Sequence, residues 1–165
     1  MAAITIRAST SSPSDVNQIP QLLNAAIPWL NSIGYTHWGV PSATPRPNPM
    51  PEVTPGDFET GRAWFAVTDG GTPEEKVVGA IVLSVKPASY CAPTVEERMG
   101  KEAFLKLLVT DREAKGQGVG ELLLEFGKEE CRRRGLEWLR SDCFRALEED
   151  TRSEEHTSEL QSPSG

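Results

Sequence analysis

The sequence is poor in the residues that build metal centres and disulfide frameworks. Its 165 residues include 3 cysteines and 2 histidines, and no two cysteines are spaced as C-x-x-C. An odd number of dispersed cysteines disfavours a disulfide framework and a zinc site, and it suits a reducing compartment. We therefore expect a cytoplasmic protein without a bound metal.

The sequence also lacks long hydrophobic runs and an excess of positive charge. No stretch approaches the ~18 apolar residues of a membrane span, and the first residues do not resemble a signal peptide. The formal net charge is −7, so we expect neither a nucleic-acid nor a membrane partner. With 38% hydrophobic and 25% charged residues, the composition is typical of one globular domain. The oligomeric state stays open.

The last residues differ in character from the rest of the chain. Residues 152–162 are polar, show no helical or strand periodicity, and resemble the in-frame translation of a widely used sequencing adapter. A natural disordered tail is the alternative. We interpret 152–165 as a non-native disordered tail, 146–151 as a junction and 1–145 as the folded domain. Without the tail's one Arg and three Glu the net charge is −5, and His156 carries no chemistry.

The first part of the chain predicts a strand, a helix and a loop. A short β-rich segment at Ile4–Ala8 precedes an apolar pattern of helical spacing, which has Ser12 as its N-cap. Pro20 and Pro28 interrupt this pattern, so we expect a kink or two shorter helices. Six of the 13 prolines lie between residues 41 and 55, which predicts a loop there.

The second part predicts a sheet with one crossover helix. Segments 63–67 and 77–83 flank strong turn chemistry and should form an antiparallel hairpin. The apolar run 104–109 predicts a central strand buried on both faces. A helix from Val119 to about Arg134 should connect it to a parallel strand at 136–144.

The segment Lys115–Gly120, Lys-Gly-Gln-Gly-Val-Gly, lies between that central strand and the helix N-terminus. Glycines let a ligand approach the backbone closely, and the free N–H groups of a first helical turn favour phosphate oxygens. A tight turn that uses glycine only for steric reasons is the alternative. Glu121 excludes both the P-loop and the G-x-G-x-x-G dinucleotide motif.

This segment, in its context, resembles the cofactor motif of the GNAT superfamily of N-acetyltransferases, Gln/Arg-x-x-Gly-x-Gly/Ala. Lys115, Gly118 and Gly120 occupy its positions, with Lys a departure at the first. The order of strand, loop, helix and strand also matches, from about Leu105 to Phe144. The resemblance implies an α/β (α+β) fold whose twisted, mainly antiparallel sheet is flanked by helices.

The resemblance also implies acetyl-CoA as cosubstrate and a small-molecule or peptide amine as acceptor. The pyrophosphate would lie on the loop amides, and the pantetheine arm would pair with the end of the central strand, where it separates from the next strand. A backbone N–H near Val109 would polarise the thioester. The implied cofactor-binding residues are Leu107, Leu108, Val109, Lys115, Gly116, Gln117, Gly118, Val119 and Gly120.

Catalytic and acceptor residues are less well defined. Asp142, near the end of the last predicted strand, is a candidate general base, or simply a solvated carboxylate. Trp38 either contacts the acceptor or anchors a loop. Cys91 and Cys143 lack a partner base and are interpreted as structural thiols.

The sequence departs from the family pattern after Phe144. The family's Asn-bearing loop, Tyr-bearing helix and final hairpin do not follow, so we expect a domain truncated at its C-terminus, with an unpaired strand edge and impaired catalysis. A non-catalytic acyl-CoA-binding or interaction protein on the same scaffold is the alternative function.

Overall fold

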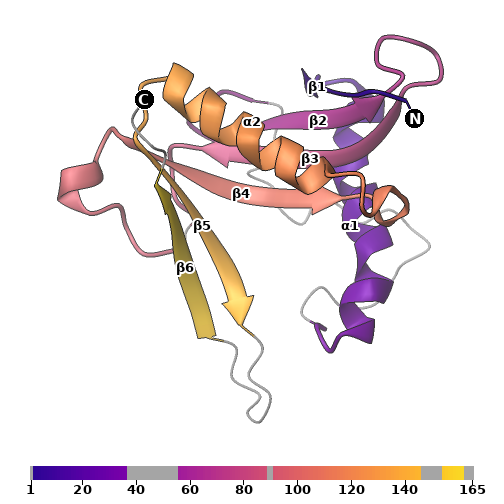
Figure 1. Cartoon of the computed structure of the whole chain (residues 1–165). Helices are drawn as coiled ribbons and strands as arrows, with labels where there is room; N and C mark the ends of the chain where they lie inside the picture. Colours follow the sequence, from indigo (N-terminus) through magenta and orange to yellow (C-terminus); the bar gives the residue numbers. More distant parts are fainter. Residues whose placement is uncertain (1, 37–55, 89–90, 146–153, 162–165) are drawn as a thin grey trace.

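The computed structural model describes residues 2–36, 56–88, 91–145 and 154–161. The predicted proline-rich loop, Trp38 and the junction 146–151 lie outside these residues. Along the chain, and in Figure 1, the elements are β1 (Ile4–Ala8), α1 (Pro13–Ser32), β2 (Arg62–Thr68), β3 (Lys76–Ser84), η1 (Glu96–Arg98), β4 (Glu102–Thr110), η2 (Arg112–Ala114), α2 (Val119–Arg133), β5 (Trp138–Arg145) and β6 (Glu154–Gln161).

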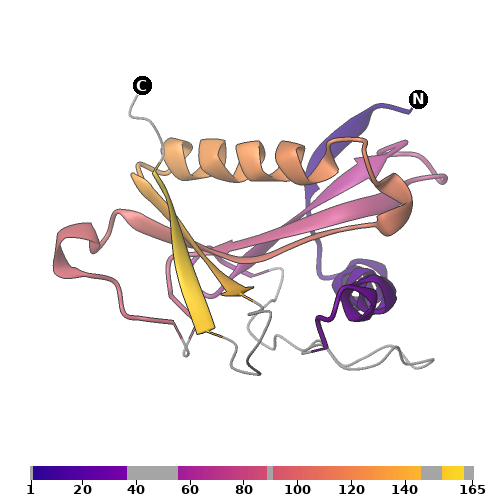
Figure 2. The same ribbon diagram turned by 60° about the horizontal axis from the view of Figure 1, so that its bottom comes forward.

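The described strands form one six-stranded sheet in sequence order, β1 to β6. Neighbouring strands are antiparallel except β4 and β5, which are parallel and connected by α2. Helix α2 covers one face of the sheet and α1 lies against the other (Figure 2). The predicted mixed, mainly antiparallel sheet flanked by helices is confirmed, as are the β2–β3 hairpin and the α2 crossover. No helix in the described part of the chain is long and apolar enough to cross a membrane.

Helix α1 is continuous across both of its prolines, so of the two predicted alternatives, a kink or two shorter helices, the second is wrong. Ser12 caps it as expected, because its hydroxyl accepts a hydrogen bond from the N–H of Asp15 at 3.2 Å. Each internal proline removes one backbone donor. The apolar face of the helix offsets this loss, since Ile19 and Leu23 pack into the core against β2, β3 and β4. Tertiary burial here outweighs local propensity.

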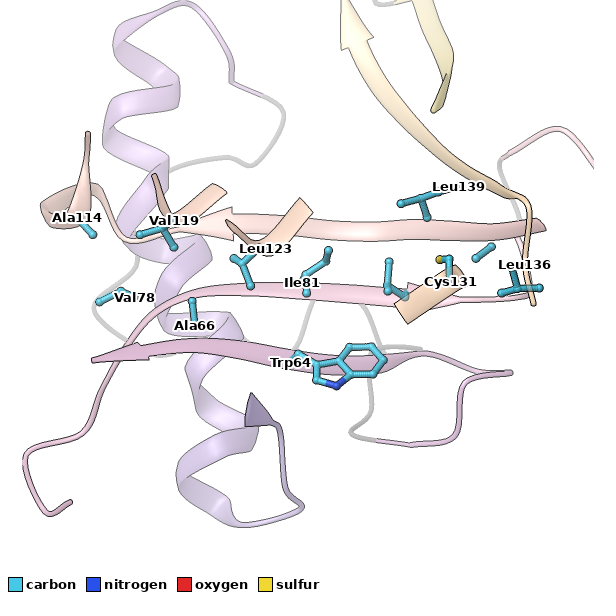
Figure 3. Close-up of a cluster of buried hydrophobic side chains, with 12 residues drawn as sticks. Trp64, Ala66, Val78, Ile81, Ala114, Val119, Leu123, Cys131, Leu136 and Leu139 are labelled. Atoms are coloured by element: carbon cyan, nitrogen blue, oxygen red, sulfur yellow. The ribbon is translucent and has the colours of Figure 1, made fainter. Parts of the chain in front are cut away.

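Helix α2 approaches β3 closely because glycine occupies both strand and helix at the contact. A Cβ at Gly79 on β3 would meet the Val119 Cγ1 at 2.8 Å, and one at Gly127 on α2 would meet the Ile81 Cδ1 at 2.8 Å. The cluster of buried side chains between the helix and the sheet is shown in Figure 3. Gly135, with φ of 74°, follows the helix in the left-handed conformation predicted for it.

The outer edge of β5 is paired, contrary to expectation. Residues 154–161 were predicted to be disordered, yet they form β6, which pairs antiparallel with β5 from Trp138↔Gln161 to Arg145↔Glu154. The physical reason is the open edge itself: a strand at the border of a sheet presents unpaired N–H and C=O groups that any extended segment can satisfy. The sequence pattern of this segment gives no such signal.

Candidate functional site

Strands β4 and β5 are joined over only part of their length. Their parallel pairing begins at Glu102↔Trp138 and ends at Leu105↔Ser141. Beyond this point β4 continues to Thr110 and β5 to Arg145, and the two strands diverge (Figure 1). On the β5 side, residues 106–110 therefore have no strand partner among the described strands. Unpaired backbone groups of this kind can bind another extended chain.

A bulge in β4 lies where the two strands separate. Val82 on β3 faces Leu107, whereas Leu83 faces Leu105, so Lys106 is an extra residue on β4. A bulge bends and twists a strand locally. Its position next to the last β4–β5 pair is the structural reason that β4 turns away from β5.

The direction of the backbone groups beyond the bulge follows from one hydrogen bond. The N–H of Asp111 donates to the carbonyl of Val78 at 2.8 Å. In an antiparallel pair the N–H groups alternate in direction, so the N–H of Val109 points to β3 while that of Leu108 points to the side where β5 has left. The side chains of Leu107 and Val109 are buried beneath α1. A ligand in the gap can therefore use the backbone of this segment, and the N–H of Leu108 is better directed than that of Val109.

The glycine segment forms the entry into α2. Gly116 and Gly118 have φ of 82° and 74°, conformations that favour glycine. Gly118 is the N-cap, no side chain caps the helix, and the first backbone bond runs from the N–H of Leu122 to the carbonyl of Gly118. Among the described residues no acceptor therefore takes a hydrogen bond from the N–H groups of Val119, Gly120 and Glu121. These three donors lie at the positive end of the helix dipole.

The glycines of this segment are not crowded by their neighbours. A Cβ built at Gly116 or Gly118 would have no heavy atom within 4 Å, and one at Gly120 would meet only the Thr110 Cγ2 at 3.8 Å. Gly120 is thus neither strained nor crowded by the fold, so steric demands of the turn do not explain it. The residues of this segment fit a phosphate group, and we call residues 115–120 the anion loop.

Charged side chains occur in the anion loop and in the turn that precedes it. Lys115 is exposed, and the guanidinium of Arg112 lies over the ring of Trp29 on α1, 4.1 Å from its centroid. Lys76 on β3 pairs with Glu113 at 2.8 Å and with Asp111 at 3.1 Å. Hydrogen bonds to these two carboxylates, that to Glu113 foremost, raise the pKa of Lys76 above its usual range.

A small cavity lies at the separation of β4 and β5. It has a volume of about 10 Å³, room for roughly one water molecule, and is lined by Ala88, Cys91, Phe104, Leu105, Lys106, Arg140 and Asp142. Asp142 is half-buried and immediately follows the last paired residue of β5. The structure thus places it at the strand separation, although it leaves its role as a base untested. The side chain of Cys143 lies outside the described part of the chain.

Arg140, which lines this cavity, belongs to a buried charged pair that the sequence did not suggest. Glu102 and Arg140 are both buried, with the Glu102 Oε1 3.5 Å from the Arg140 Nε. Arg140 also donates to the carbonyl of Ala92 at 2.7 Å. Neither residue of this pair carries a local signal in the sequence.

The fold places the uncapped N-terminus of α2 next to the open edge of β4, at the point where the parallel strands β4 and β5 diverge. The chain belongs to the acetyltransferase (GNAT) family, whose family model matches residues 35–152. No curated protein sequence matches.

Several solved structures share the fold at low sequence identity. The ribosomal-protein-S18-alanine N-acetyltransferase from Escherichia coli superposes with a TM-score of 0.54 at 16% identity, over 88% of this chain and 70% of that one. A GNAT-family acetyltransferase from Staphylococcus aureus gives 0.52 at 14%, over 86% and 74%. An aminoglycoside 6′-N-acetyltransferase solved with coenzyme A gives 0.51 at 13%, over 87% and 64%.

Proposed function

We propose that the protein transfers an acetyl group from acetyl-CoA directly to an amine, either of a small molecule or of a peptide, in the cytoplasm. The observation that carries this proposal is the juxtaposition of the anion loop with the open edge of β4. Phosphate donors and an unpaired extended backbone occur side by side, which suits a ligand with a pyrophosphate at one end and an amide-bearing arm at the other. One structural neighbour, the aminoglycoside acetyltransferase, was solved with coenzyme A.

In this proposal the chain's own groups hold the ligand at three points. The N–H groups of Val119 and Gly120 donate to the pyrophosphate, and Lys115 contributes a positive charge. The backbone of Leu108 pairs with the pantetheine amides along β4. Gly116, Gln117 and Gly118 shape the loop, and the buried side chains of Leu107 and Val109 fix the strand.

Acetyl-CoA supplies an activated acetyl group: the amine nitrogen forms the new C–N bond as the C–S bond breaks and CoA leaves. Binding both reactants at the strand separation supplies much of the rate through proximity. A base must first take the proton of the ammonium form. We propose Asp142 for this role, because it is the one carboxylate among the described residues that lines the cavity at the separation.

The proposal is tested with calorimetric titration of CoA and with an assay of thiol release from acetyl-CoA across a panel of amines. Gly120→Asp places a carboxylate in front of the loop donors. It should weaken CoA binding roughly tenfold or more while leaving thermal stability unchanged or slightly higher, since an acidic side chain at a helix N-terminus is worth about 0.3–1 kcal/mol. The control Gly120→Asn places a side chain of the same shape but without the charge at the same position, and it should weaken CoA binding less. Failure of the wild-type protein to bind CoA would overturn the proposal.

A second candidate is a non-catalytic acyl-CoA-binding protein. It is favoured by the side chains that line the cavity: among the described residues, no histidine or tyrosine lies there with Asp142. Tight CoA binding without thiol release for any amine in the panel would support this candidate over the enzyme.

A further inference from the structure

The anion loop and the turn before it carry a nearly balanced set of charges. Between Thr110 and Gly120 the acidic residues are Asp111 and Glu113, and the basic residues are Arg112 and Lys115. The guanidinium of Arg112 lies over Trp29 on α1. A ligand with several phosphates therefore meets a segment whose own charges sum to zero, with two carboxylates close in sequence to the donor groups.

Lys76 contacts both of these carboxylates from outside the loop. Its Nζ lies 2.8 Å from the Glu113 Oε2 and 3.1 Å from the Asp111 Oδ2. Asp111 is largely buried, with 15% of its side chain exposed. Its carboxylate accepts a hydrogen bond from the N–H of Glu113 at 3.0 Å, and its own N–H donates to the carbonyl of Val78 on β3. Lys76 thus completes a set of contacts that attaches the turn before the anion loop to β3.

We propose that Lys76 is a positioning residue for the anion loop: it neutralises Asp111 and Glu113 and holds the turn that carries them, so that the loop presents net positive charge to the phosphates of CoA. With Lys76 the local charge is +1, and without it the charge is zero. The inference rests on the proposed function, because it assigns Lys76 a role toward the ligand named there.

The test compares Lys76→Met with a matched control, Lys101→Met. Both lysines are 53% exposed, and Lys101 pairs with Glu137 at 3.8 Å near the start of β4, away from the loop. Titrations use CoA and pantetheine as probes, since pantetheine lacks all the phosphates. Lys76→Met should raise the Kd for CoA roughly three- to tenfold in low salt, an effect that falls at high ionic strength. The Kd for pantetheine should stay the same, and Lys101→Met should change neither.

Two further variants separate charge from structure. Lys76→Arg keeps the charge and should restore CoA binding. In the Lys76→Met/Glu113→Gln double variant one of the two carboxylates is removed, so part of the lost affinity should return. Circular dichroism melts check that each variant folds.

Distinct results identify which idea fails. If the wild-type protein binds CoA but Lys76→Met behaves like Lys101→Met, the role of Lys76 is wrong and the proposed function stands. If Lys76→Met weakens CoA and pantetheine equally, the substitution acts on more than the phosphate contacts, and the proposed role of Lys76 toward the anion loop is overturned. A wild-type protein that does not bind CoA overturns the proposed function and this inference with it.

Discussion

Leu105 on β4 faces Ser141 on β5, and this is the last pair that joins the two parallel strands. The next residue of β4, Lys106, forms the bulge toward β3. The end of pairing on one side of β4 and the register shift on its other side therefore occur at neighbouring residues. This arrangement leaves the following segment joined to β3 alone.

Proline substitutions on β4 should separate ligand contact from sheet stability. Leu108→Pro removes the N–H that points to the open side, and we expect acetyl-CoA binding to weaken about tenfold through loss of one backbone donor. Val109→Pro removes an N–H directed at β3 and leaves its partner carbonyl unsatisfied, which should cost about 1–3 kcal/mol of unfolding free energy. Urea denaturation and CoA titration of the two variants give the comparison. Equal destabilisation with equal loss of binding would contradict the assigned directions.

Gly79→Ala should disturb the anion loop through direct contact with the start of α2. The new Cβ would lie 2.8 Å from the Val119 Cγ1 and 3.2 Å from the Val109 carbonyl oxygen, so we expect a loss of about 1–3 kcal/mol from overpacking. Because Val119 begins α2, its displacement also moves the donor groups, and CoA binding should weaken. Gly120→Ala is the stability control: its Cβ has open space, so the unfolding free energy should not fall. Thermal melts distinguish the two variants.

The buried pair of Glu102 and Arg140 should be more sensitive to the loss of one partner than of both. Arg140→Met leaves the carboxylate of Glu102 buried, with Arg98 at 3.8 Å as its remaining cation. Breaking a buried pair in this way costs about 3–5 kcal/mol. In the double variant Glu102→Gln/Arg140→Met neither member of the pair is charged, and most of that loss should be recovered. Urea midpoints measure both, and a double variant less stable than Arg140→Met would refute the explanation.

Acid should destabilise the protein in part through Asp15 on α1. Arg7 donates two hydrogen bonds to its carboxylate, each of 2.9 Å, and these together with bonds from Thr10 lower the pKa of Asp15 to about 2. Because the folded pKa is depressed, the stabilisation is present above the unfolded pKa of ~3.9 and is lost as the pH falls toward 2. We expect it to amount to about 2 kcal/mol.

The Asp15→Asn variant provides the measurement for this effect. The difference in unfolding free energy between wild type and variant should be constant above about pH 5 and shrink between pH 4 and 2. A difference that does not change with pH would show that the interaction of Asp15 with Arg7 is not ionic.

The sequence predicted the elements whose signals are local. The turn chemistry around Gly70, the apolar run ending at Val109 and the caps of α2 each depend on a few neighbouring residues, and the structure confirms all three. The position of the glycine segment between a strand and a helix start was predicted as well, because these features adjoin in sequence; its role toward phosphate stays a prediction.

The features that sequence reasoning missed depend on distant contacts. Helix α1 continues through Pro20 because Ile19 and Leu23 bury against strands far along the chain. Glu102 and Arg140 belong to different strands, and neither carries a local signal. Lys106 could have been read as an interruption, but the register of β3 decides that it is a bulge.

The stack of Arg112 on Trp29 connects the turn before the anion loop to helix α1, which lies on the other face of the sheet from α2. Trp29 is 41% exposed near the end of α1, and Arg112 belongs to the turn that precedes the anion loop. Any molecule that binds near the end of α1 and favours one position of Trp29 also changes the free energy of the loop. Thermodynamic reciprocity then requires that a ligand on the loop change the affinity for that molecule by the same factor. The contact of Arg112 with Trp29 is the physical connection that such a coupling between the two faces of the sheet would use.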